Sequence, residues 1–108
     1  MTRIRLTLTP DGQQVCGFEV KGHTGFAPQG EDIVCAAVSF LATTCANALE
    51  TVAGIVPKVK QAEGLLSVTV TASALNPAAR TIFQVFSQGI DDLSQAYPDH
   101  VQFVPKHS

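Results

Sequence analysis

Several features on which whole classes of proteins depend are absent from this sequence or rare in it. Tryptophan is absent, tyrosine and methionine occur once each, and only 15% of the 108 residues are charged. The seven basic residues are scattered along the chain, and the formal net charge is −2. Nucleic-acid binding requires concentrated positive charge to hold the phosphates. We therefore expect no direct nucleic-acid partner.

Cysteine is also scarce, with three residues and no paired spacing between them. An odd number argues against a disulfide framework, and a reducing compartment suits a free reactive thiol. The first ten residues, MTRIRLTLTP, mix charged, apolar and hydroxyl side chains, unlike the continuous apolar region of a signal peptide. We expect a cytoplasmic protein.

Local metal-binding pairs are missing as well. No C-x-x-C or H-x-x-x-H pair supplies two ligands from one turn of the chain. This disfavours a zinc site built from Cys16, His23, Cys35 and a further ligand. We expect neither a metal nor another cofactor.

The longest apolar stretch, residues 33–56, has the length of a membrane span. It contains polar residues, among them Ser39, Thr43, Thr44, Asn47 and Glu50. This composition favours a buried helix, so we expect no membrane association. The helix is apolar on nearly all sides, and such a helix must be covered on more than one side. A sheet would cover one side, and the second helix or a second subunit would cover another.

The hydrophobic fraction of 45% is sufficient for the core of one compact domain over residues 1–108. Apolar residues alternate with polar ones at positions 4–8, 16–21 and 66–71, which predicts strands. The first two strands form a hairpin, turned at residues 10–12, that ends just before His23. Residues 56–61 are ambiguous, with a short edge strand turning at Glu63 and Gly64 as one reading. Val101 and Phe103 indicate a last short strand.

Two helices complete the pattern. The first runs from Ile33 to about Ala53, ending at Gly54. The second starts at Asn76 and Pro77 and carries an apolar stripe, consisting of Ile82, Phe83, Phe86, Ile90 and Leu93. We predict an α+β fold in the order ββαβαβ. It is a two-layer sandwich in which two helices pack on one face of a largely antiparallel sheet of four to five strands.

Residues 22–39, GHTGFAPQGEDIVCAAVS, carry the chemistry-bearing side chains. Asp32 is a good N-cap, which would make Cys35 the third helical residue and place its sulfur near the positive end of the helix dipole. That dipole contributes roughly 0.3–1 kcal/mol, too little to ionise the thiol near neutral pH. A second group is needed, and His23 is the histidine near enough in sequence to supply a cation or a base.

The motif G-H, a short Gly-containing loop, then G-x-D-I-V-C-A-A-V-S resembles that of the ribosomal-processing cysteine protease family called Prp. The matching positions are Gly22, His23, Gly30, Asp32, Ile33, Val34, Cys35, Ala36, Ala37, Val38 and Ser39. The resemblance covers nearly the whole chain. It implies a thiol peptidase, a hydrolase, that removes the N-terminal extension of the twenty-seventh large-subunit ribosomal protein beside aromatic residues. It also implies a homodimer.

The resemblance implies Cys35 as the nucleophile, His23 as its base, and Asp32, Ser39 and Gly22 as supporting residues. Ser39 shares a helix face with Cys35, so it either reaches toward the sulfur or bonds to its own helix backbone. Asp32 either caps the helix or orients His23.

The loop between the histidine and the helix is rich in small and turn-forming residues. Gly25 and Gly30 permit unusual backbone conformations. Phe26 either packs on the core or covers a bound peptide as an active-site lid. We therefore assign Gly25, Phe26 and Gly30 to a substrate loop. Free N–H groups of the first helical turn, that of Cys35 included, are candidates for stabilising an oxyanion.

Two other classes of function remain open from the sequence. One is a non-catalytic interaction module that binds a ribosomal protein, with Cys35 simply buried. The other is a redox sensor, which needs Cys16 or Cys45 within bonding reach of Cys35. We expect Cys16 and Cys45 to be core residues, and His100 and His107 to be solvated.

Overall fold

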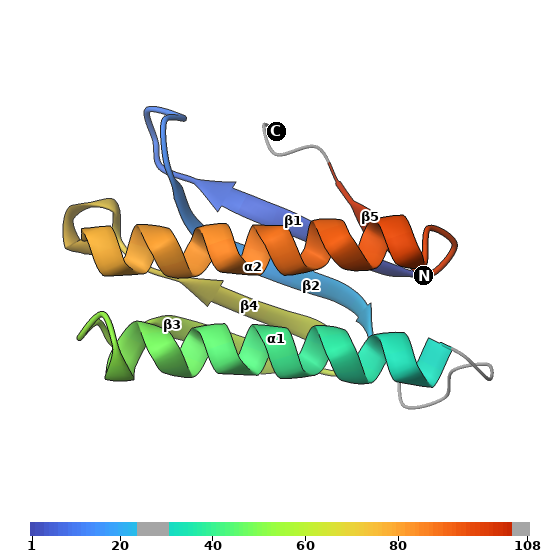
Figure 1. The fold of residues 1–108 in the computed structure, drawn as a ribbon. Helices are drawn as coiled ribbons and strands as arrows, with labels where there is room; N and C mark the ends of the chain where they lie inside the picture. Colours follow the sequence, from blue (N-terminus) through green and yellow to red (C-terminus); the bar gives the residue numbers. More distant parts are fainter. Residues whose placement is uncertain (24–30, 105–108) are drawn as a thin grey trace.

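The computed structural model describes residues 1–23 and 31–104, without the side chains of His23, Glu31 and Asp32. Five strands and two long helices form two layers (Figure 1). The elements are β1 (Thr2–Leu8), β2 (Val15–His23), α1 (Glu31–Thr51), β3 (Lys58–Ala62), β4 (Gly64–Thr69), a 3-10 turn (Ala72–Ala74), α2 (Pro77–Ala96) and β5 (Val101–Phe103).

The sheet has the order β3-β4-β2-β1-β5. All neighbouring strands are antiparallel except β1 and β5, which run parallel. Both helices lie along the same face of the sheet (Figure 1). The predicted two-layer α+β fold is confirmed. The ambiguous stretch is the edge strand β3, so the full order is ββαββαβ rather than ββαβαβ.

The core lies between the sheet and the helices. Phe18 of β2 stacks on Phe86 of α2, with ring centroids 3.9 Å apart and planes inclined by 13°. Phe83 meets Phe18 edge to face at 6.3 Å. All three rings are almost completely buried. Aromatic pairs in these geometries add to the stabilisation that comes from burying apolar area.

Helix α2 is amphipathic, as its sequence predicts. Its buried residues are Ala79, Ile82, Phe83, Phe86 and Ile90. The side-chain oxygen of Asn76 accepts a hydrogen bond from the N–H of Ala79 at 2.9 Å, which confirms the N-cap. The amide nitrogen of Asn76 also donates to the carbonyl of Ala53 at 2.9 Å, which ties the start of α2 to the segment after α1.

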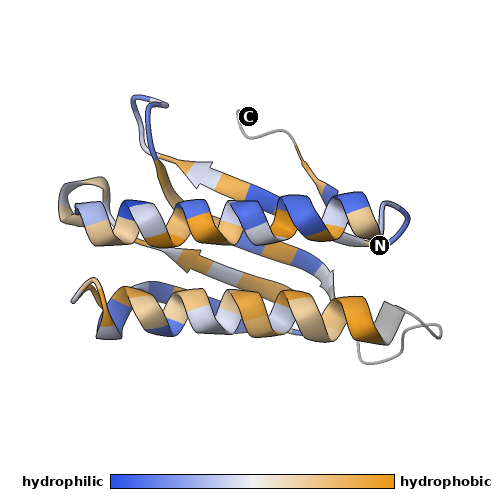
Figure 2. Cartoon of the chain, in the orientation of Figure 1, coloured by the Kyte–Doolittle hydropathy of each residue, from blue (hydrophilic) through white to orange (hydrophobic). Residues whose placement is uncertain are grey.

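Helix α1 is mostly apolar (Figure 2), but its exposed positions are mixed, with Thr44, Asn47 and Glu50 as well as apolar residues. The prediction of a helix that is apolar on nearly all sides is therefore only partly right. Its inner side places Val34, Val38, Ala42, Cys45 and Leu49 in the core. Ile33 and Phe40 are 68% and 75% exposed on its outer side. Residues Ile33–Thr51 are long and apolar enough to cross a membrane, and 33% of that window is buried. The buried residues on the inner side of α1 pack in the core, as those of a core helix in a folded domain do.

The predicted C-terminal end of α1 is confirmed, whereas its predicted start is not. At its C-terminal end, Gly54 has a φ of +72° and the N–H of Ile55 donates to the carbonyl of Leu49 at 2.8 Å, which confirms a left-handed cap. At the other end, the helix begins at Glu31, so Asp32 lies inside the first turn. The prediction that Asp32 is the N-cap is therefore wrong.

Candidate active site

The elements that carry the motif meet at one end of the molecule. The end of β2 and the start of β4 lie beside the start of α1 there, and the N-terminus lies at the same end (Figure 1). His23 is the last residue of β2 and pairs with Gly64, the first residue of β4. The fold thus brings the backbones of His23 and Cys35 to the same end. The side chain of His23 lies outside the described part of the chain.

Gly22 is placed in a position that only glycine fits well. Its φ is +86°, and a Cβ added to it would lie 2.5 Å from the carbonyl oxygen of Met1. The pairing of β2 with β4 is irregular between Lys21 and His23, on either side of Gly22. Such an irregularity redirects the next side chain. Gly22 therefore sets how the backbone enters His23, and its role as a supporting residue of the site stays a prediction.

Cys35 is the fifth residue of α1 rather than the third, because the helix begins at Glu31. In the regular α-helical pattern its N–H is directed to the carbonyl four residues earlier. The prediction that its own N–H is a free oxyanion donor is therefore wrong, and candidate donors lie earlier in the turn.

The Cys35 side chain is 8% exposed, and its sulfur lies 3.9 Å from the hydroxyl oxygen of Thr2 in β1. Thr2 was not predicted as a site residue. In the sequence, Thr2 occupies the same alternating positions of the strand as Ile4 and Leu6, so its hydroxyl is expected to face the core. The alternation predicts a side chain inside the sheet at this position, and a polar one there needs a partner.

Ser39 lies one turn beyond Cys35 on α1 and is partly buried. It lines a cavity of about 170 Å³ between α1 and the β3–β4 hairpin. Apolar side chains form much of the lining: Val20, Val38, Ala42, Leu65 and Leu66. Gly64, the pairing partner of His23, is also part of the wall. Ser39 thus lies at a hollow next to the candidate site.

Four other predicted site features fall outside the description. Gly25, Phe26 and Gly30, assigned to the substrate loop, lie outside the described residues. The side chain of Asp32 lies outside them too, so its other predicted role, orienting His23, stays a prediction.

The remaining cysteines are buried, as predicted. Cys16 and Cys45 are 7% and 4% exposed. Burial raises the pKa of the Cys16 thiol and that of the Cys45 thiol, because an apolar environment disfavours the thiolate. All three cysteines are free.

The histidine His100 is half-buried rather than fully solvated, which corrects the prediction for that residue. His107 lies outside the described residues. Among the residues that the structure describes, no group of three or more His, Cys, Asp or Glu side chains could hold a metal ion.

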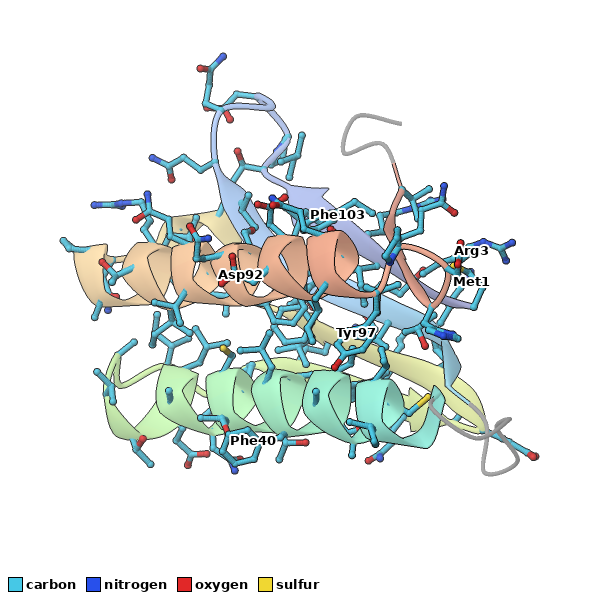
Figure 3. The ribbon with its side chains drawn as sticks, turned by 45° about the vertical axis from the view of Figure 1, so that its right-hand side comes forward. Met1, Arg3, Phe40, Asp92, Tyr97 and Phe103 are labelled. Carbon is cyan, nitrogen blue, oxygen red and sulfur yellow. The ribbon has the colours of Figure 1, made fainter. Side chains whose placement is uncertain are left out.

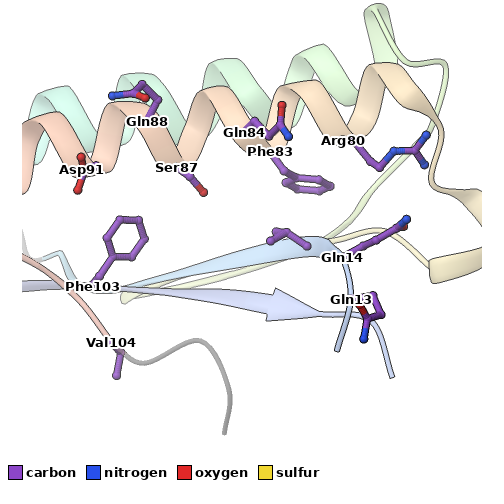
Figure 4. A pocket seen from close by; sticks show the side chains of 11 residues that line it. Gln13, Gln14, Arg80, Phe83, Gln84, Ser87, Gln88, Asp91, Phe103 and Val104 are labelled. Carbon is purple, nitrogen blue, oxygen red and sulfur yellow. The ribbon is translucent and has the colours of Figure 1, made fainter. Parts of the chain in front are cut away.

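A larger cavity, of about 840 Å³, lies between α2, the β1–β2 hairpin and the end of β5 (Figure 4). Phe83, Phe103 and Val15 contribute apolar surface to it, and Gln84 and Gln88 contribute amides. None of the predicted site residues lines this cavity. We do not assign the active site to this larger cavity, because the motif residues lie where β2 ends and α1 begins.

A cysteine near the start of a long helix and a histidine at the end of β2 are the residue types with which a thiol peptidase forms its nucleophile and base, and their backbones lie at the same end of the molecule (Figure 1). The chain belongs to the family described as Cysteine protease Prp, whose model matches residues 1–102. The chain is accordingly a cysteine protease. Family membership decides against the alternative of a non-catalytic interaction module.

A known protein similar to the chain carries the name of the family, and a solved structure shares its fold. The ribosomal processing cysteine protease Prp of Bacillus subtilis (strain 168) is 29% identical over 93 residues, which cover 82% of this chain and 83% of the relative. The crystal structure of SMU.848 from Streptococcus mutans is 27% identical with a TM-score of 0.86, covering 95% and 91% of the two chains.

A third similar protein shows the fold. The essential ribosomal processing protease Prp from S. aureus, in complex with a substrate peptide, is 20% identical with a TM-score of 0.85. The match covers 96% of this chain and 98% of that one. The two-layer arrangement of the present chain is thus the fold of that protease.

Proposed function

We propose that this protease removes the N-terminal extension of the twenty-seventh large-subunit ribosomal protein, cutting beside aromatic residues. The observation that carries the proposal is the match to the Prp family over residues 1–102. The Bacillus subtilis relative is named for ribosomal processing. The partner would then be an N-terminal segment of a ribosomal protein, bound in extended form.

In the proposed mechanism, the Cys35 thiolate attacks the carbonyl carbon of the scissile peptide bond. His23 takes the thiol proton and later gives it to the departing amine. Water then hydrolyses the acyl-enzyme and regenerates the thiol.

The test is incubation with the extended ribosomal protein, followed by mass measurement of both fragments. Cys35→Ala should bind the peptide and leave it uncut, and His23→Ala should lose most of its activity. Cys45→Ala is the matched control, since Cys45 lies on the same helix within the core. Cleavage by Cys35→Ala at the wild-type rate would rule out the assigned nucleophile.

We further propose a homodimer that uses the outer side of α1. Ile33 and Phe40 are 68% and 75% exposed there, and Phe40 lies on the side of α1 away from α2 (Figure 3). Exposed apolar patches of this kind are common at protein–protein interfaces. Sedimentation should show a dimer for the wild type and a monomer for Phe40→Glu. A wild-type monomer at micromolar concentration would contradict the proposal.

We propose the cytoplasm as the location, because the three cysteines are free and a thiol nucleophile needs reducing conditions. Fractionation of cells that express the tagged chain tests this. Recovery of the protein with the membranes would contradict it.

A further inference from the structure

The contact between Thr2 and Cys35 joins two segments that are far apart in the sequence. The hydroxyl oxygen and the sulfur are 3.9 Å apart, within hydrogen-bonding reach for sulfur, and either atom could be the donor. Thr2 is 1% exposed and Cys35 is 8% exposed. Water is therefore largely excluded from the pair, and the interaction is not screened as a surface contact would be.

The backbone around Thr2 is held on both sides. Its N–H donates to the carbonyl of His100 at 2.8 Å, and it pairs with Val101 of β5. A Cβ on Gly22 would come within 3.8 Å of the Thr2 Cα, so β2 lies close on the other side. The sheet therefore fixes where the hydroxyl points, and α1 brings the sulfur to it.

A threonine at this position needs an explanation. The side chains of Thr2, Ile4 and Leu6 all point to the helix-covered face of β1 and are 1%, 0% and 1% exposed. Valine has nearly the same shape as threonine and would satisfy the same packing without a hydroxyl to be desolvated. A buried hydroxyl is tolerated when it has a hydrogen-bond partner, and the Cys35 sulfur is in position to be that partner.

We propose that Thr2 is a positioning residue that donates its hydroxyl hydrogen to the Cys35 sulfur when that sulfur is a thiolate. The inference rests on the proposed function of Cys35 as the nucleophile. In the neutral pair either group can donate, whereas a thiolate can only accept. The contact is therefore stronger for the thiolate, and it holds the anion on the sheet side of α1.

Other titratable groups belong to the elements that meet at this end of the molecule. The N-terminal amine and Arg3 belong to β1, Lys21 belongs to β2, and Tyr97 and His100 lie between α2 and β5. Met1, Arg3 and Tyr97 are labelled at this end of the molecule in Figure 3. His23, Glu31 and Asp32 flank the loop before it. A substitution confined to Thr2 leaves all of these groups in place.

The test compares the wild type with Thr2→Val and Thr2→Ser. The rate of alkylation of Cys35 by iodoacetamide is measured from pH 5 to 10 in the folded protein, with the labelled residue identified by peptide mapping. Thr2→Val keeps the shape of the side chain and removes the hydroxyl. Thr2→Ser keeps the hydroxyl and removes a methyl group. Thermal melting of each variant shows that the labelled protein is folded.

The alkylation rate of Cys35 at neutral pH should fall in Thr2→Val, because the sulfur anion loses the hydroxyl that donates to it. Thr2→Ser should stay close to the wild type. A Thr2→Val profile that overlays the wild type, or an equal shift in Thr2→Ser, overturns the inference. The labelling contains no substrate, so a wild type that leaves the ribosomal peptide intact counts against the proposed function and not against the role of Thr2.

Discussion

Substituting Gly22 by alanine should damage both the stability and the active site, because this glycine lies where two strands come together. Its φ of +86° costs alanine about 1–2 kcal/mol. The added Cβ would also lie 2.5 Å from the Met1 carbonyl oxygen, closer than any ordinary contact. Relieving overpacking of this kind costs about 1–3 kcal/mol. We therefore expect a total loss of about 2–5 kcal/mol.

Gly12 provides the matched control in the β1–β2 turn. Its φ is +72°, and an added Cβ would meet no atom within 4 Å. Gly12→Ala should therefore lose only the conformational part, about 1–2 kcal/mol. Urea unfolding measures both variants, and the difference between them isolates the clash. In a domain of this size it should appear as a melting temperature lower by at least about 4 °C in Gly22→Ala.

Activity adds a second readout, because His23 follows Gly22 directly. Relief of the clash moves the backbone that carries the histidine, and small misplacements of catalytic groups are costly. We expect Gly22→Ala to lose peptide cleavage under conditions where it is still folded, while Gly12→Ala keeps it. Equal stability and equal activity of the two variants would refute the reasoning.

Three further predictions concern the core, a cap and the buried thiols. Phe86→Ala should cost about 3–5 kcal/mol in urea unfolding, because its ring is fully buried against Phe18, and Leu there should cost less. Asn76→Ala should cost about 1–2 kcal/mol through loss of the α2 cap, and Asn76→Asp should recover part of this because it keeps the acceptor for the Ala79 N–H. Burial raises the pKa of the Cys45 thiol in the folded protein. The stability that Cys45 contributes is therefore complete below about pH 8.5, the pKa of an exposed thiol, and is lost as the pH rises through the pKa of the folded state. The free energy of unfolding should therefore fall less between pH 8 and 10 in Cys45→Ala than in the wild type, and identical slopes would contradict this.

Local patterns in the sequence were enough to predict most of the fold. Alternation at Ile4, Leu6, Phe18 and Val20 places one face of the hairpin in the core, because strand side chains alternate between faces. The stripe on α2 and its Asn76 cap follow equally directly from helical periodicity and from a side chain that accepts a backbone hydrogen bond. The start of α1 was not predictable to the residue, because Glu31 and Asp32 both suit a first helical turn.

By itself, the sequence determined the class of fold and the motif that joins a histidine, a loop and a cysteine within 18 residues, since both depend on residue types at short spacing. The tertiary structure decided what lies around the sulfur. Thr2 and Cys35 are 33 positions apart and meet only because β1 and α1 both begin at the same end of the molecule, so no local pattern could pair them. The parallel pairing of β5 with β1 likewise depends on where the last strand packs after α2.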